Sequence, residues 1–244
     1  MTPTLLWAIR RTRRKVRQAF TRRFGPEQFR QALLATPTPR LVIGAARRFD
    51  PDWIPSEQCY LDLLKPEQWT SFMAPSSVDA MLAEHVWEHL TAAEGLAAAR
   101  VCYHHLKPGG YLRLAVPDGY NPDPVYHEWV RVGGEGQAQR GNGHKVLYTY
   151  HTITDLLEQA GFQIKLYEYF TEAGDFRYHH WDRAGGTIRR SLRYDPRNQH
   201  GQLGFTSIVL DAVKPTSTSP KLATFTIADG IESSATWATH AATR

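Results

Sequence analysis

The sequence predicts an α/β protein with a mostly parallel sheet, helices on both faces and an antiparallel final edge strand. From residue 40 onward, apolar strand segments alternate with helical segments, which is the pattern of β/α units. Thr91 and Glu94 form a capping box that opens the clearest of these helices. The last two strand candidates have no helix between them, so we expect them to pair antiparallel at one edge of the sheet.

Each expected element has its own local signal. Runs rich in Val, Ile and Leu that are bounded by Gly or Pro predict strands, and Gly161 followed by apolar Phe162 predicts a helix end. In chain order we expect a strand at 40–44, short extended segments at 53–57 and 59–64, a strand at 78–85, a helix at 92–106, a strand at 111–118, a helix at 152–161, and strands at 163–170 and 204–214. Polar loops at 119–147 and 171–203 interrupt this series.

The chain divides into three parts by composition. Residues 1–38 form a basic amphipathic extension, residues 39–214 form one domain, and residues 215–244, rich in Ser, Thr and Ala, predict a disordered tail. Two cysteines without a CxxC pattern argue against a disulfide framework, and no apolar run is long enough for a membrane span. We therefore expect a cytoplasmic protein.

The basic charge belongs to the extension. Residues 1–30 carry nine Lys and Arg against one Glu, a balance of +8, so the rest of the chain contributes −3 to the total of +5. This distribution weakens a nucleic-acid interpretation that is based on overall charge.

Residues 4–24 predict an amphipathic helix. Leu5, Ile9, Val16 and Phe20 fall on one face at helical spacing, and arginines cover the remainder. One interpretation is docking to an anionic membrane surface or an acidic partner, which would make the protein peripheral to the inner membrane face. The other is a helix that packs its apolar stripe on its own domain.

Polar residues recur at the expected strand ends. In an open α/β sheet, ligands bind beyond the carboxyl ends of the strands, so these positions predict a binding crevice. They are Gly44, Glu57, Asp62, Glu84, His85, Glu88, His89, Pro117 and Asp118.

Several motifs share one order and spacing: "LVIGA", "WIPSE", "YLDLL", "SVDAMLAEHVWEHL", "LKPGGYLRLAVPD" and "YTYHTITDLLEQAGF". Together they resemble the class I S-adenosylmethionine-dependent methyltransferases, most closely the compact bacterial branch whose first motif leads quickly into a "gWinvD"-like second strand. The resemblance covers about residues 39–214, and it implies a Rossmann-like fold and S-adenosyl-L-methionine as the cofactor.

The resemblance also implies roles for individual residues. Gly44 and Ala45 would form the turn under the methionine part of the cofactor. Glu57 would bind the ribose hydroxyls, because a carboxylate can accept two hydrogen bonds from a vicinal diol. Asp62 would lie near the adenine amine, and Glu84 and His85 would line the methionine and sulfonium end.

The sequence departs from the family pattern at one point. The family usually has a second glycine where this chain has Ala46. The added methyl group either fits where φ stays negative or narrows the pocket.

A hydroxyl acceptor also requires a general base, usually His or a carboxylate. The catalytic candidates are His85, Asp118 and His144, each with a structural alternative: a structural histidine, a turn carboxylate and an exposed loop histidine. We expect no metal site, because the adjacent His179 and His180 would point to opposite faces of a strand.

The leading hypothesis is therefore a methyltransferase that acts on a small molecule or a glycan. The alternative is a non-catalytic binding or scaffold protein that keeps the fold with a degenerate cofactor loop. A nucleic-acid methyltransferase is disfavoured, because the chain lacks an "NPPY"-like tetrapeptide for a flipped base.

Overall fold

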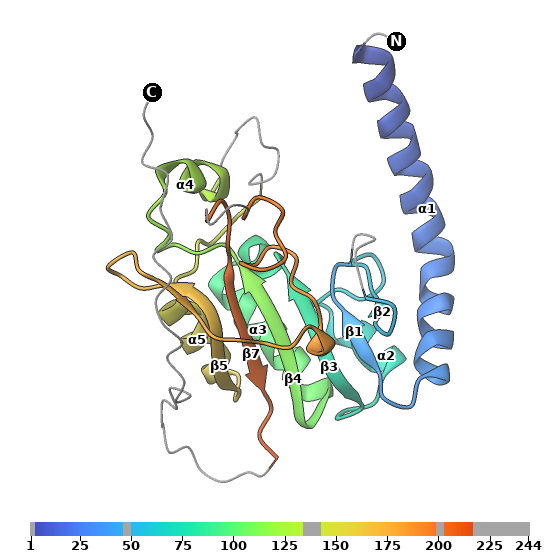
Figure 1. The fold of residues 1–244 in the computed structure, drawn as a ribbon. Coiled ribbons are helices and arrows are strands. Elements are labelled where there is room, and N and C mark those ends of the chain that lie inside the picture. Colours follow the sequence, from blue (N-terminus) through green and yellow to red (C-terminus); the bar gives the residue numbers. More distant parts are fainter. Residues whose placement is uncertain (1–2, 46–49, 134–142, 199–202, 217–244) are drawn as a thin grey trace.

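In the computed structural model, seven strands of the described residues form one sheet with the order β2-β1-β3-β4-β7-β5-β6 (Figure 1). The structure describes residues 3–45, 50–133, 143–198 and 203–216, and the side chains of residues 3–18 lie outside that description. The strands are β1 (Arg40–Val42), β2 (Ile54–Pro55), β3 (Val78–Glu84), β4 (Leu106–Val116), β5 (Gln163–Phe170), β6 (Phe176–Tyr178) and β7 (Ile208–Val213).

The order in which strands are added to the sheet reverses at β1. Strand β2 pairs parallel with one side of β1, and β3 pairs parallel with the other. Strand β4 continues the parallel series next to β3. The carboxyl ends of β1 and β3 therefore frame a topological switch point, which is where open α/β sheets bind ligands.

Helices cover one face of the sheet. They are α2 (Pro66–Phe72), α3 (Ala92–His105) and α5 (Tyr150–Gln159), and in Figure 1 α3 and α5 lie behind the strands. The capping box of Thr91 and Glu94 opens α3 as predicted, and Gly161 adopts a φ of 105° after α5. Ala98, Cys102 and Ile153 from these helices pack on Leu112 and Leu210 of the strands.

An irregular segment packs on the opposite face, where the sequence analysis expected helices. We call residues 181–198 the covering segment; it crosses in front of the sheet in Figure 1. Its Trp181 and Ile188 pack on Val42, Leu82 and Val209 of the strands. Its helical content is the short turn η2 (Arg183–Gly185).

A buried ion pair attaches the covering segment to the sheet. Arg113 of β4 donates to both carboxylate oxygens of Asp211 of β7, at 2.8 and 2.9 Å. The same guanidinium donates to the backbone carbonyls of Asp182 and Gly186. Its charge also lies 5.2 Å from the ring centre of Trp181. One arginine thus links two strands to the covering segment.

The predicted α/β, Rossmann-like, mostly parallel sheet is confirmed, because β1 to β5 run in one direction. The predicted position of the final strand is wrong. Strand β7 is antiparallel, but it lies between β4 and β5, and β6 forms the edge. Five of the six residues of β7 are buried, all of them apolar except Asp211, and such near-complete burial is typical of an interior strand.

Three smaller predictions also differ from the structure. Residues 59–64 form turns, since the Tyr60 and Leu61 N–H groups donate to the Glu57 carbonyl. The loop at 119–147 contains α4 (Pro124–Val130), capped by Asp123. Strand β4 begins at Leu106 without the gap that "KPGG" predicts.

The amino-terminal helix α1 (Pro3–Ala35) is longer than predicted. Its last turns pack on the domain through Phe29, which lies 5.3 Å from Phe72 and 5.7 Å from Tyr60 between ring centres. Of the predicted apolar stripe, only Phe20 has a described side chain, and it is 55% exposed. Contact of residues 4–24 with an anionic membrane stays a prediction, and residues 217–244 of the expected tail lie outside the described residues.

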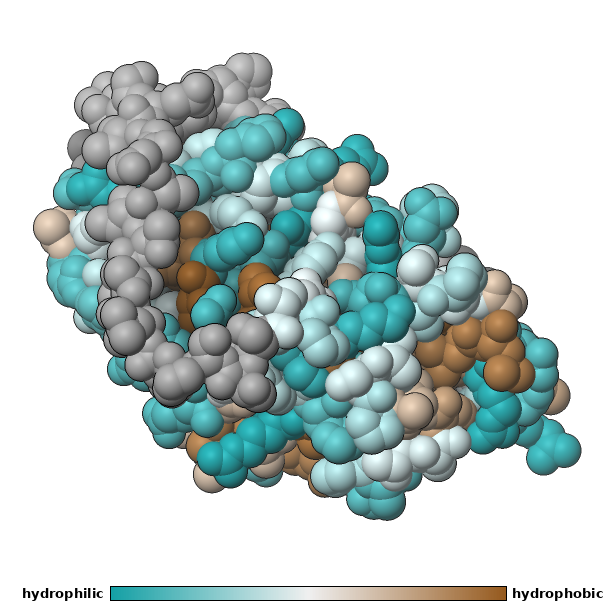
Figure 2. All heavy atoms as spheres, turned by 90° about the horizontal axis from the view of Figure 1, so that it is seen from below, coloured by the Kyte–Doolittle hydropathy of each residue, from teal (hydrophilic) through white to brown (hydrophobic). Residues whose placement is uncertain are grey.

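Seen from the amino ends of the parallel strands, the visible surface is largely hydrophilic, with apolar side chains in separate patches (Figure 2). Within the described residues, no helix is long and apolar enough to cross a membrane.

A second buried carboxylate predicts how stability depends on pH. Glu168 of β5 accepts hydrogen bonds from Trp181 Nε1 and the Leu192 N–H, both in the covering segment. Burial raises the pKa of Glu168 to about 7, against these stabilising hydrogen bonds and Arg193. Since the folded state holds this proton at a higher pH than the unfolded state, Glu168 favours folding more strongly as pH falls from about 7 towards 4.5.

We expect urea denaturation at a series of pH values to show the contribution of Glu168 as a difference between the wild type and Glu168→Gln. The free energy of unfolding of the wild type should gain more on acidification from pH 8 to 5 than that of Glu168→Gln, which cannot titrate. Parallel pH profiles for the two proteins would contradict the assignment.

Candidate functional site

The turn after β1 has the backbone conformation that its glycine permits. Gly44 has a φ of 62°, in the left-handed region that disfavours side chains. An added Cβ would meet only Val86 Cγ2, at 3.5 Å, so conformation rather than space requires glycine here. The Ala45 N–H then donates to the Ser56 carbonyl, which joins this turn to the end of β2. Ala46 lies outside the described residues, so whether its methyl group narrows the pocket is not tested by this structure.

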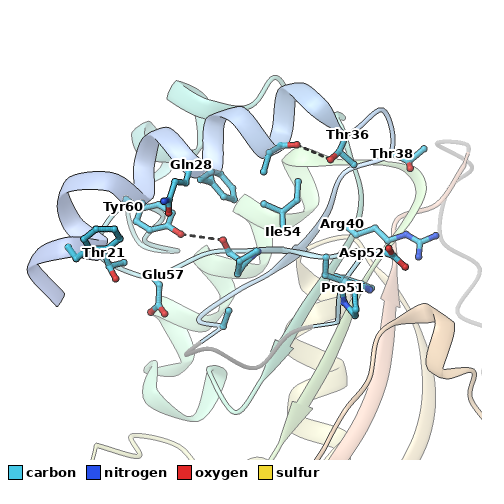
Figure 3. A pocket seen from close by; sticks show the side chains of 17 residues that line it. Thr21, Gln28, Thr36, Thr38, Arg40, Pro51, Asp52, Ile54, Glu57 and Tyr60 are labelled. Carbon is cyan, nitrogen blue, oxygen red and sulfur yellow. Dashed lines mark hydrogen bonds between the residues drawn. The ribbon is translucent and has the colours of Figure 1, made fainter. Parts of the chain in front are cut away.

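A pocket of about 930 Å³ lies between α1 and the edge formed by β1 and β2 (Figure 3). Of the predicted cofactor residues, Ala45 and Glu57 line it. No hydrogen bond to the Glu57 carboxylate is found within the described part of the chain, so its oxygens can accept a ligand's donors. Burial, and then the charge of Glu57, raises the pKa of Tyr60 to about 12 on the same wall.

The other predicted acid of this region serves the turn before α2. The Asp62 carboxylate accepts the Leu64 N–H at 3.0 Å and Gln58 Nε2 at 3.4 Å. The Asp62 carbonyl accepts Trp69 Nε1. Asp62 does not line the pocket. An interaction with adenine would require exchange of these bonds, and it stays a prediction.

Glu84, at the end of β3, contacts the covering segment. Its carboxylate oxygens accept the N–H groups of Arg189 and Arg190 at 3.3 and 2.8 Å. The covering segment therefore uses the hydrogen-bond acceptors of Glu84, the residue that the resemblance places beside the cofactor. Access for a ligand at this strand end depends on movement of the covering segment.

His85 is the next residue, and its backbone is unusual. Its φ is 57°, a conformation that is uncommon for residues other than glycine and often marks a functional position. Its Nε2 lies 2.9 Å from Ser207 Oγ, and its Nδ1 lies 3.1 Å from Glu88 Oε1. A carboxylate on one side of an imidazole and a hydroxyl on the other is the arrangement that orients a general base. Ser207 itself is fully buried, so it is not presented as a nucleophile.

Two predicted catalytic histidines converge on Glu88. His144 Nε2 lies 3.9 Å from Glu88 Oε1, the oxygen that also faces His85. Burial opposes ionisation of Glu88, but the attraction of His85 and smaller contacts outweigh it, so the pKa of Glu88 lies below its usual range. His144 is buried and hydrogen-bonded, unlike the exposed loop histidine of the alternative interpretation.

Asp118, the third catalytic candidate, lies in a buried network after β4. Its oxygens accept the N–H groups of Tyr120 and Phe170 at 2.9 and 2.7 Å. Burial raises its pKa to about 6, although these bonds and His127 favour the charged form. The carboxylate thus holds the loop after β4 to the end of β5, and a contact with an acceptor would require that loop to open.

The predicted residues therefore form two groups. Ala45 and Glu57 share the pocket beside α1, while His85 and His144 meet at Glu88, with Glu84 directly before His85. Glu88 was among the strand-end residues of the predicted crevice but had no assigned role, and Ser207 was not predicted. The spacing of His85 and Glu88 along the chain was a usable signal, but Ser207 lies 122 residues from His85 and offered none.

Comparisons with known proteins give distant structural similarities. No family model and no curated protein matches the sequence. A SAM-dependent methyltransferase from Thermotoga maritima has a TM-score of 0.44 at 14% identity, over 84% of this chain and 97% of that one. One from Archaeoglobus fulgidus has a TM-score of 0.41 at 13% identity, over 79% and 94% of the two chains.

An O-methyltransferase family protein from Burkholderia thailandensis has a TM-score of 0.43 at 11% identity, over 82% of this chain and 58% of that one. These similarities are too distant to assign an activity. The function of this chain must be inferred from its own residues.

Proposed function

We propose that this protein is an S-adenosylmethionine-dependent methyltransferase that acts on a small-molecule or glycan acceptor. The observation that carries the proposal is the pocket of about 930 Å³ between α1 and the edge formed by β1 and β2, with the unbonded carboxylate of Glu57 on its wall. Its volume lies within the usual range for ligand pockets. Ala45 and Glu57, which line it, follow the carboxyl ends of β1 and β2, the ends at which open α/β sheets bind ligands.

The residues of the pocket fit the cofactor. S-adenosylmethionine supplies, when bound, an electrophilic methyl group on a positively charged sulfonium. Glu57 would accept hydrogen bonds from the two ribose hydroxyls. The turn at Gly44 and Ala45 lets a ligand approach the backbone closely.

His85 is the residue that we propose as the general base for a hydroxyl acceptor. Its Nε2, which faces Ser207 Oγ in this structure, would receive the proton once the acceptor hydroxyl takes the place of that contact. Glu88 beside Nδ1 would orient the ring and stabilise the charge that the ring gains. His85 follows directly on the end of β3, next to β1 in the sheet. Alignment of acceptor and methyl group there would supply much of the rate enhancement.

A non-catalytic binding protein is the second candidate, and one observation favours it. The covering segment bonds to the Glu84 carboxylate at the end of β3. A protein that keeps this segment in place would bind a ligand beside α1 without bringing an acceptor to His85.

Release of S-adenosylhomocysteine distinguishes the two candidates. The full-length protein would be incubated with S-adenosylmethionine and separate pools of phenols, hydroxy acids and oligosaccharides, and the product quantified by mass spectrometry. We expect release that depends on one pool. Cofactor binding without release in any pool would favour the non-catalytic protein.

A further inference from the structure

Three side chains near the end of β3 lie close enough to share one ion. Glu88 and His89 belong to the short helix η1 (Trp87–His89), and His144 comes from the segment before α5. One potential ligand atom from each residue lies within 4.8 Å of the other two. We propose that Glu88, His89 and His144 bind a divalent transition-metal ion such as Zn²⁺.

The carboxylate of Glu88 has fewer partners than its burial demands, with His85 on one side only. The residue is 1% exposed, and neither oxygen has a hydrogen-bond partner among the described residues. His85 Nδ1, 3.1 Å from Oε1, pairs with the carboxylate electrostatically and leaves room for a second cation at its other side. A buried carboxylate is stable only when it is paired, hydrogen-bonded or coordinated to a metal. A bound cation would satisfy this group.

Both histidines are oriented as metal ligands usually are. His144 Nδ1 lies 2.9 Å from the Val130 carbonyl, and His89 Nδ1 lies 3.2 Å from the Gly143 carbonyl. Since a carbonyl can only accept, each Nδ1 donates the hydrogen bond, which directs Nε2 of each ring away from the backbone as the atom available to an ion. Metal-binding histidines typically donate their other ring N–H to a backbone carbonyl in this way.

The separations between the residues match a coordination sphere. Two ligand atoms bound at about 2.1 Å to one ion lie roughly 3 to 4.2 Å apart, depending on the angle between them. The 3.9 Å between His144 Nε2 and Glu88 Oε1 fits this range directly. The other two separations involve the exposed His89, whose ring can adjust toward the ion.

The backbone holds His144 beside Glu88. The N–H groups of Lys145 and Val146 both donate to the Glu88 carbonyl, at 2.7 and 3.3 Å. Lys145 Nζ also lies 2.8 Å from the Glu94 carboxylate at the start of α3. A donor set that is fixed by its backbone loses little entropy when it binds an ion.

The donor set selects the class of ion. Two imidazoles and one carboxylate suit Zn²⁺, Co²⁺ or Mn²⁺, whereas Mg²⁺ and Ca²⁺ prefer oxygen ligands only. Three protein ligands leave a coordination position for water or substrate on the exposed side of His89. From the sequence we expected no metal site, on the basis of His179 and His180 alone. Glu88 and His89 are separated from His144 by more than fifty residues, so the sequence did not bring these three together.

An ion here would lie next to His85, which shares Glu88 with it. This role rests on the proposed function: in methyl transfer, the ion would bind the oxygen of the acceptor hydroxyl and favour loss of the hydroxyl proton. Binding of the ion by the protein does not depend on that reaction.

Cobalt titration tests the site without any activity assay. Full-length, tag-free protein would be treated with a chelator, dialysed and titrated with Co²⁺, while visible absorption and calorimetric heat are recorded. We expect saturation at one Co²⁺ per chain, and displacement of Co²⁺ by Zn²⁺. Glu88→Gln and His89→Ala should each weaken Co²⁺ binding at least about tenfold.

His104→Ala serves as the matched control, since His104 is an exposed histidine on α3. Its affinity for Co²⁺ should equal that of the wild type. No saturable binding, or equal affinity in wild type, Glu88→Gln and His89→Ala, would overturn the site. Because His89 is exposed, its replacement tests the ion without risk to the core.

Discussion

Replacement of His85 with asparagine is expected to lower the rate of methyl transfer by about 100- to 10,000-fold, the usual contribution of a general base. Asparagine suits this test because it tolerates the left-handed backbone of residue 85 better than most side chains. It removes the imidazole that lies between Ser207 and Glu88. The measurement is S-adenosylhomocysteine release at saturating cofactor, with the acceptor found by the pool assay.

The matched control for this variant is His104→Asn, on the exposed surface of α3. It should keep the wild-type rate, and circular dichroism should show that both variants are folded. A folded His85→Asn protein with an unchanged rate would remove His85 as the base, leaving His144 as the remaining histidine of the predicted set.

Replacement of Arg113 with alanine is expected to lower the free energy of unfolding by about 3–5 kcal/mol, since it leaves the buried charge of Asp211 without its partner. The change also removes the hydrogen bonds to the Asp182 and Gly186 carbonyls, which attach the covering segment to the sheet. Urea denaturation measures the loss. Relative to the wild type, amide hydrogen exchange in Arg113→Ala should accelerate more in residues 181–198 than in the rest of the chain.

Two further variants test whether the unpaired charge of Asp211 causes the loss of stability. Arg100→Ala replaces an exposed arginine on α3 and should change stability by less than about 0.5 kcal/mol. The double variant Arg113→Met, Asp211→Leu removes both charges and should be more stable than Arg113→Ala alone. A loss below about 1 kcal/mol in Arg113→Ala would show that the ion pair does not hold the covering segment.

The order of the elements could be predicted from the sequence because it depends on local patterns. The capping box at Thr91 and the glycine after α5 each act within a few residues. The interior position of β7 depends on pairing with β4, about 95 residues earlier in the chain, and no local pattern encodes it. The nearly apolar composition of "IVLDAV" is compatible with an interior strand, but it does not specify the neighbours of that strand.

The sequence predicted which residues follow the strands, but it did not predict which side chains and loops contact those residues. Gly44 and Glu57 followed from the position of β1 and β2, which local sequence defines. The occupation of Glu84 by Arg189 and Arg190, and the approach of His144 to Glu88, depend on how long loops fold back over the sheet. These contacts join residues that lie 56 (Glu88 and His144) to 106 (Glu84 and Arg190) positions apart, and a single sequence does not specify them.

Calorimetric titration of S-adenosylmethionine into the wild type and into Glu57→Gln tests the central claim most directly. Glutamine keeps the size of the side chain but removes the charge that would accept the ribose hydroxyls. We expect saturable binding of one cofactor per wild-type chain, and an affinity at least about tenfold weaker in Glu57→Gln, as for a lost hydrogen bond to a charged group. Absence of wild-type binding at millimolar cofactor would contradict the proposed function, and equal affinities would contradict the role of Glu57.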